Sequence, residues 1–219
     1  QAVGFQRYDL NNYNTGLLSF GDGYSNNLNY TISLGRENRV LKPIFPNYGS
    51  EFSVTAIFTP PYSLWNNVDY ENLDQQEEFQ LKNERGQLAV SIIDPNTGRQ
   101  VAGRPIREGE DPAGDQSKID QEKFKWLEFY KVKFKGSWFT TLYNFGGNSN
   151  LVLRTHSEYG FLGSYNSDRG IPPVERFYLG GDGLGAFSLD GRETIALRGY
   201  PNQTVVPEDR ANSRATNQD

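Results

Sequence analysis

The chain has no cysteine, no methionine and only one histidine among its 219 residues. Without cysteine, neither a disulfide framework nor a thiolate metal site can form. No run of 18 apolar residues occurs, which excludes a transmembrane helix. Because even an initiator methionine is lacking, we expect a processed chain or a piece of a longer protein. The net charge of −5 argues against a nucleic-acid partner, which usually meets a basic face.

Aromatic residues and glycine are abundant, although apolar residues make up only 36% of the chain. Aromatics reach 14%, mainly Tyr and Phe, and glycine occurs 23 times. This mixture is typical of a β-rich, turn-rich protein with too little aliphatic content for an ordinary core. A transmembrane β-strand needs only about 9–11 residues with every second one apolar. A membrane barrel is therefore compatible with the composition.

Four segments alternate apolar and polar residues with period two, which predicts β-strands: 28–34, 52–58, 130–142 and 151–161. The last two read as a hairpin with a tight turn over 144–148, where two glycines supply the positive φ angles that such turns need. A soluble sandwich also has one polar face, so alternation alone fits both classes. Strand length, aromatic residues near the strand ends and uncharged apolar faces favour a membrane barrel. The polar face of the hairpin carries Lys131, Lys133, Lys135, Arg154, His156 and Glu158.

The segment 60–122 separates the second and third predicted strands and holds thirteen acidic and six basic residues. A connection this long is usually functional or carries structure of its own, and we expect a helical stretch within 69–86. Outer-membrane barrels have short periplasmic turns and long extracellular loops. The 144–148 turn is therefore expected on the periplasmic side and the 60–122 insertion outside. Since about eight strands is the minimum for closure, four strands predict a barrel fragment.

No constellation of catalytic or metal-binding residues is recognisable. His156 is interpreted as a polar residue facing the barrel lumen, with only Lys and Arg expected nearby. Asp182 and Asp190 lie among glycines but lack the spacing of a calcium loop. Paired carboxylates such as Glu77 and Glu78 fall in a charged loop, where solvation explains them. We therefore predict no enzyme activity, no catalytic or metal site and no cofactor.

Residues 197–200, Leu-Arg-Gly-Tyr, follow a glycine-rich run near the end of the chain. A solvated surface arginine would explain this loop by itself. With its lead-in, however, the region resembles the corresponding part of the BamA-type outer-membrane protein assembly factors. Farther upstream, Phe45, Pro46, Gly49 and Ser50 resemble the periplasmic turn of that family, although its usual glycine is missing near Arg39. The lead-in consists of Glu175, Phe177, Tyr178, Gly180 and Gly181, and the loop motif of Leu197, Arg198, Gly199 and Tyr200.

The resemblance implies an all-β, antiparallel transmembrane barrel of sixteen strands, preceded by POTRA domains, in which the four predicted strands are the eighth to eleventh. It further implies that the loop tip folds back into the lumen, where Arg198 pairs with acids on the wall. Gly199 would then pass close to the wall, with Tyr200 packed beside it. The composition and the segment "FLGSYN" resemble a Bacteroidetes-like variant.

The function implied by the resemblance is nucleotide-independent folding and insertion of β-barrel proteins into the outer membrane of a Gram-negative bacterium. Expected partners are unfolded outer-membrane proteins, accessory lipoproteins or surface subunits, and lipid and lipopolysaccharide. The alternatives are a two-partner-secretion or TamA-like translocation barrel, a passive porin, or a soluble sugar-binding sandwich.

Five regions follow from this interpretation of the sequence. They are an extracellular loop over 1–24, two barrel strands with a periplasmic turn over 25–59, the acidic extracellular insertion over 60–122, a long barrel hairpin over 123–170, and an extracellular loop with the Leu-Arg-Gly-Tyr motif and a flexible tail over 171–219.

Overall fold

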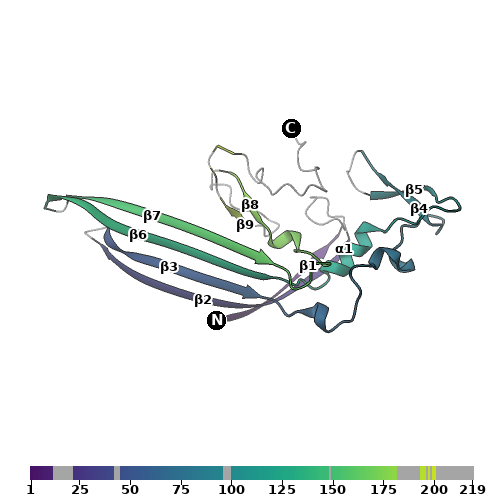
Figure 1. Ribbon diagram of the computed structural model, residues 1–219, viewed down its shortest axis with the longest axis horizontal. Helices are drawn as coiled ribbons and strands as arrows, with labels where there is room; N and C mark the ends of the chain where they lie inside the picture. The colour runs from purple at the N-terminus through teal and green to yellow at the C-terminus, as the bar shows by residue number, and fades with distance from the viewer. Residues whose placement is uncertain are drawn as a thin grey trace.

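A computed structural model describes residues 1–11, 22–41, 45–95, 100–147, 149–181, 193–195, 197 and 199–200. Its main feature is an antiparallel sheet with the strand order β1-β2-β3-β6-β7 (Figure 1). The predicted fold class, an all-β antiparallel barrel fragment, is confirmed. The five strands of this sheet are β1 (Ala2–Leu10), β2 (Gly23–Leu41), β3 (Pro46–Phe58), β6 (Tyr130–Gly146) and β7 (Ser149–Gly163).

Strand β1 corrects the prediction of a loop over 1–24 and of about four strands. It pairs antiparallel with β2 from Ala2 opposite Thr31 to Leu10 opposite Gly23. The strands β2 and β3 are also longer than their alternating cores. Their pairing extends as far as Leu41 opposite Pro46, so Pro46, Gly49 and Ser50, expected in the periplasmic turn, belong to β3. Backbone pairing extends these strands beyond the residues whose hydrophobicity alternates.

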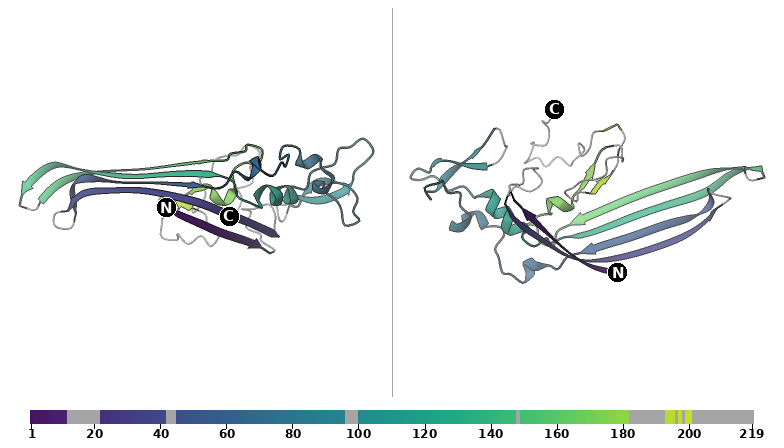
Figure 2. Two further views of the ribbon diagram at one scale, coloured as in Figure 1. Left: turned by 90° about the horizontal axis from the view of Figure 1, so that it is seen from below. Right: turned by 180° about the vertical axis from the view of Figure 1, so that it is seen from behind.

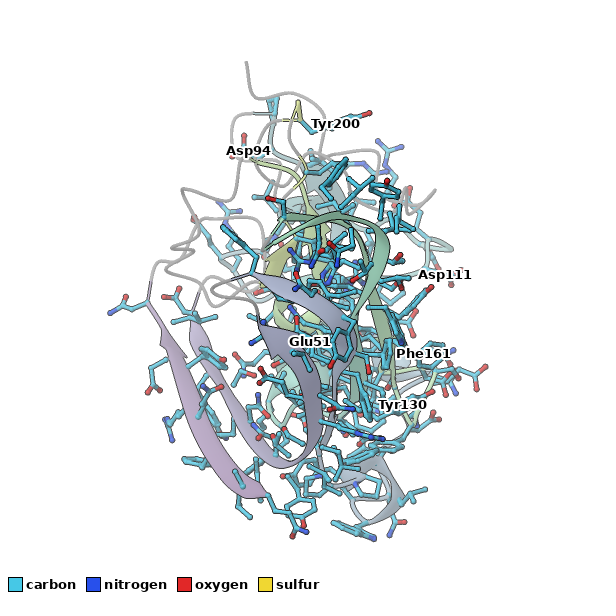
Figure 3. The ribbon with its side chains drawn as sticks, turned by 90° about the vertical axis from the view of Figure 1, so that its left-hand side faces the viewer. Glu51, Asp94, Asp111, Tyr130, Phe161 and Tyr200 are labelled. Carbon is cyan, nitrogen blue, oxygen red and sulfur yellow. The ribbon has the colours of Figure 1, made fainter. Side chains whose placement is uncertain are left out.

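The register gives the sheet one apolar and one polar face. Because successive side chains of a strand point to opposite faces, apolar residues of neighbouring strands line up in several cross-strand rows on one face. One row joins Tyr30, Phe58 and Tyr130, and another joins Leu34, Val54, Phe134 and Tyr159. Many apolar side chains on this face remain largely exposed. Tyr130 and Phe161 lie together on one side of the strands (Figure 3). The exposed set includes Val3, Phe5, Leu34, Trp138, Leu153, Tyr159 and Phe161.

The two ends of the sheet differ in the length of their connections. At one end, β6 and β7 are joined by a tight turn in which Gly146 and Gly147 have φ angles of 94° and 62°. The amide of Gly146 donates to the Asn144 side chain at 2.7 Å. The long insertion lies beyond the opposite end (Figures 1 and 2). This asymmetry is the one expected of a barrel with short turns on one side and long loops on the other.

The insertion between β3 and β6 carries structure of its own. Its α-helix forms at α1 (Gln116–Phe124), capped by the Asp115 side chain, and not within 69–86 as the sequence suggested. The region 69–86 instead forms two 3₁₀ turns whose Leu73 packs with Tyr70 and Ile119. The remaining elements are η1 (Tyr62–Leu64), η2 (Leu73–Gln75), η3 (Glu77–Phe79), β4 (Ala89–Ile93) and β5 (Gln100–Pro105).

A second hydrophobic cluster fixes the end of the insertion and the following chain on the polar face of the sheet. Ile57 of β3 and Leu162 of β7 reach it from the strands. After β7 the chain forms η4 (Pro173–Glu175) and a short parallel pair, β8 (Phe177–Leu179) and β9 (Glu193–Ile195). None of the helices in the described part of the chain is long and apolar enough to cross a membrane. The buried members of the cluster are Phe124, Leu127, Phe129 and Val174.

Candidate functional site

The segment that precedes the Leu-Arg-Gly-Tyr motif is fastened to the polar face by Glu175. Its carboxylate lies 3.5 Å from Nζ of Lys131 and accepts a hydrogen bond from the Asn27 side chain at 3.2 Å. The Lys131 ammonium also donates to the Glu175 main-chain oxygen at 3.0 Å. The two charged side chains are only 4% and 17% exposed. Asn27 of β2 and Lys131 of β6 therefore both bind the end of η4.

Phe177 completes this attachment from the next element, β8. Nζ of Lys131 lies 4.5 Å from the centroid of its ring, a cation–π geometry. The ring also covers Gly160 of β7, where an added Cβ would come within 2.7 Å of the ring edge. Tyr178 donates a hydrogen bond to the Pro173 carbonyl at 3.0 Å and packs against the cluster around Phe129. We refer to Glu175, Phe177, Lys131 and Asn27 as the loop anchor.

The two glycines after β8 form backbone hydrogen bonds with β9 and with the Leu-Arg-Gly-Tyr motif. Gly180 donates to the Ile195 carbonyl at 3.1 Å, and Gly181 donates to that of Tyr200 at 2.8 Å. Gly181 in turn accepts from the amide of Leu197 at 2.9 Å. Gly180 and Gly181 have φ angles of 132° and 83°, which residues with a Cβ rarely adopt. The Gly-Gly pair thus joins the lead-in to the motif through the backbone.

Within the motif, the Tyr200 amide closes a turn on the Leu197 carbonyl at 3.3 Å, with Gly199 at a φ of 91°. No described atom lies within 4 Å of a Cβ placed on Gly199; its expected passage along the wall involves strands beyond the described residues and stays a prediction. Glycine is required there by its backbone angle. Tyr200 is 53% exposed. Arg198, and with it the expected pairing, lies outside the described residues, as do Asp182 and Asp190.

All six hairpin residues predicted to share the polar face do so. The register places His156 opposite Ser137 and Glu158 opposite Lys135. Contrary to the expectation of only basic neighbours, His156 contacts the Ser137 hydroxyl at 2.9 Å and the Glu158 carboxylate at 3.1 Å. Glu158 also pairs with Lys135 at 3.3 Å. The guanidinium of Arg154 lies 5.8 Å from the ring centroid of Phe139 on the neighbouring strand.

The Ser137–His156–Glu158 chain has the composition of a hydrolase triad but not its accessibility. Ser137 is only 2% exposed, so its hydroxyl is not open to a substrate. The described residues contain no group of three or more His, Cys, Asp or Glu side chains that could hold a metal ion. The three side chains form a chain of hydrogen bonds that links β6 and β7.

Sequence reasoning missed a buried ion pair between Arg169 and Glu128. The guanidinium lies 2.7 Å from the carboxylate, and the two side chains are 3% and 1% exposed. Arg169 also donates to the carbonyls of Lys123 and Trp126. Glu128 accepts from the amide and hydroxyl of Ser63 at 2.7 and 2.6 Å. The pair connects both ends of the insertion to the chain that leads into the loop anchor, over a separation of 41 residues.

Comparison with known proteins gives one result at family level. Residues 113–218 match the Omp85 superfamily domain. The matched span contains β6, β7, Arg169, most of the loop anchor and the Leu-Arg-Gly-Tyr motif. No curated protein and no solved structure matches the chain.

Proposed function

We propose that this chain, whose residues 113–218 match the Omp85 superfamily domain, forms part of the barrel wall of a BamA-type assembly factor. Such a factor folds and inserts β-barrel proteins into the outer membrane without nucleotide. The domain match indicates an outer-membrane insertase or translocation family and supports an outer-membrane location. The observation that carries the finer assignment is the loop anchor, because Glu175 and Lys131 hold the lead-in of the motif against the polar face. The composition and the "FLGSYN" segment extend the proposal to a Bacteroidetes-like variant.

In this proposal the two faces of the sheet have different surroundings. The exposed apolar rows face lipid, which accepts them without cost. The polar face, with Lys131, Lys133 and Lys135, lines the lumen. The motif then enters the lumen from the extracellular side, because the long connections and the loop anchor share one end of the sheet. Arg198 would pair with wall carboxylates through its planar five-donor group, which a lysine does not reproduce.

The test is reconstitution of the full-length protein into lipid vesicles with an unfolded outer-membrane barrel protein added from outside. An insertase raises the rate at which the substrate becomes folded and resistant to protease, and it does so without nucleotide. A rate equal to that of protein-free vesicles would contradict the proposal.

A translocation barrel of the two-partner-secretion or TamA type is the second candidate, because the superfamily match covers such proteins equally well. It predicts that a passenger protein appears inside the vesicles, and that folding of barrel substrates is not accelerated. The number of POTRA domains preceding the barrel in the full-length protein separates these classes as well.

We also propose that the insertion binds accessory subunits at the cell surface. Its β4–β5 hairpin exposes Ile92, Ile93 and Val101 to between 41% and 50%. Leu88 and Ile106 flank the hairpin and are joined by a backbone hydrogen bond of 3.0 Å, so a short linker can replace 89–105. The deletion should release surface subunits during purification and leave barrel folding unchanged. Retention of all copurifying subunits would show that the hairpin is not their docking site.

A further inference from the structure

The first turn of the insertion exposes its largest apolar side chains to solvent. Leu64 is 72% exposed and Trp65 is 66% exposed. From Thr59 to Val68 the chain carries no charged residue, although the remainder of the insertion is strongly acidic. An exposed leucine beside an exposed tryptophan in an uncharged stretch is the composition of a surface that meets an apolar phase. We refer to η1 together with Trp65 as the apolar turn.

The apolar turn is rigidly held, so the exposure of these two side chains does not reflect a loose loop. Ser63, between Tyr62 and Leu64, uses both its amide and its hydroxyl to bind the buried carboxylate of Glu128. The ring of Tyr62 packs against that of Trp126 at a centroid distance of 5.2 Å and against Trp65 at 6.4 Å. With Ser63 fixed to Glu128, Leu64 and Trp65 are left on the outside.

The contacts of residues 127–129, just before β6, place the apolar turn toward the apolar side of the sheet. Leu127 and Phe129 pack into the cluster on the polar face. Glu128, between them, therefore lies toward the opposite side, where Ser63 binds it. The Thr59 amide donates to the Phe129 carbonyl at 3.1 Å, which continues the β3–β6 pairing up to the residue before the insertion.

The strand ends from which the turn departs carry further aromatic side chains. Phe58, the last residue of β3, lies opposite Tyr130 on the apolar face, and Tyr165 packs on Tyr130 at a centroid distance of 5.4 Å. Aromatic side chains thus lie both at the strand ends and in the apolar turn, which begins four residues after Phe58. In Figure 3, Tyr130 lies on the same side of the strands as Phe161.

We propose that the apolar turn is a membrane-interface anchor, in which Leu64 and Trp65 enter the boundary between the acyl chains and headgroups of the outer leaflet. The inference rests on the membrane placement in the proposed function. Lipid is favoured as the occupant because the turn directly follows the end of β3, where the proposed lipid-facing rows end, and carries no charge that a protein partner would pair. A tryptophan ring with an apolar body and an N–H donor is suited to this interface.

The test places one environment-sensitive fluorophore at a time on the full-length protein in phosphatidylcholine vesicles brominated either near the headgroup or near the chain end. Leu64→Cys carries the label on the apolar turn. Tyr159→Cys carries it on the apolar strand face, and Glu84→Cys carries it on an exposed turn of the insertion. The chain itself contains no other cysteine, and all three positions are exposed, so labelling does not require unfolding.

The label at position 64 should lose fluorescence in brominated vesicles, more with bromine near the headgroup than near the chain end. The label at 159 should show the reverse depth preference, and the label at 84 should be quenched only by aqueous iodide. If brominated lipid quenches the label at 159 while the label at 64 responds only to iodide, the proposed interface anchor is wrong and the membrane placement of the strands stands. If 64 is shielded from both quenchers, a protein partner covers it and the anchor is also wrong. No lipid quenching at 159 would overturn the membrane placement and the anchor together.

Discussion

Replacement of Lys131 by methionine removes the charge at the centre of the loop anchor while keeping a side chain of similar length. The substitution deletes the ion pair to Glu175 at 3.5 Å and the hydrogen bond to the Glu175 main-chain oxygen at 3.0 Å. It also removes the cation from the Phe177 ring. Asn27 remains as a donor to the carboxylate, so Glu175 keeps one of its partners.

The cost follows from the burial of the pair. Breaking a buried ion pair by removing one partner costs about 3–5 kcal/mol, because the remaining charge is left desolvated. Glu175 is 17% exposed and retains Asn27, which places the expected cost near the lower end, about 3 kcal/mol. Since each 1.4 kcal/mol is a factor of ten, the attached state of the lead-in should weaken by roughly a hundredfold.

Lys135→Met is the matched control, because it makes the same chemical change on the same face of the same strand. Lys135 pairs with Glu158 at 3.3 Å, but these side chains are 54% and 40% exposed. Exposed pairs contribute about 0–1 kcal/mol. The double variant Lys131→Met with Glu175→Gln should recover part of the loss, since it no longer buries a carboxylate charge without the lysine ammonium.

The assay is limited proteolysis of the protein in vesicles, with cleavage followed in the 164–200 segment. Lys131→Met should raise the cleavage rate there strongly, Lys135→Met should leave it near the wild-type rate, and the double variant should lie between them. Equal rates for the two single variants would refute the argument, because burial would then not decide the strength of attachment.

Three further predictions concern other charged groups. Arg169→Met should expose the insertion to protease at a cost of about 3–5 kcal/mol, whereas Arg169→Lys should recover part of the protection; an unaltered cleavage pattern would contradict a structural role for its buried pair with Glu128. Arg198→Ala should lower outer-membrane protein levels more than Arg198→Lys, and normal levels in the alanine variant would refute an inward pairing. Arg104 donates two hydrogen bonds that lower the pKa of Glu110 to about 2 from 4.5. The pair therefore stabilises the β4–β5 region above pH 4.5, and this stabilisation is lost as the pH falls toward 2. Glu110→Gln should increase pepsin cleavage of the region at about pH 4 relative to wild type, and identical cleavage would contradict this.

The long strands could be predicted because apolar and polar residues alternate strongly in them. Strand β1 could not be predicted because its alternation is weak. In β2, β3, β6 and β7 several apolar residues recur on one face. In β1 only Val3 and Phe5 do so before Arg7 takes the next position on that face. Pairing with β2 stabilises β1, and a pairing partner is not visible in a local pattern.

The structure of the insertion depends on packing between distant residues. The stretch 69–86 looked helical by composition, but Tyr70 and Leu73 are buried against Ile119, almost fifty positions away. The actual helix begins at an Asp115 cap, and its short amphipathic signal is weak. In both places tertiary contacts, and not helix propensity, determine the local structure.

The candidate site was predictable in its residue types but not in its partners. The resemblance singled out Glu175 and Phe177, yet nothing local indicated that Lys131 would contact both. The Arg169–Glu128 pair could not be inferred for the same reason, since the two residues come together only when the insertion folds back on the strand ends. The Ser137 partner of His156 required the register of the β6–β7 hairpin, which bulges shift between Thr141 and Gly146.

The most direct measurement of the central claim is the folding of an unfolded outer-membrane barrel protein into vesicles that contain the full-length protein, its Lys131→Met variant or its Lys135→Met variant, without nucleotide. The account predicts that the wild type and Lys135→Met accelerate folding over protein-free vesicles and that Lys131→Met loses most of the acceleration. Folding by the wild type at the protein-free rate would contradict it.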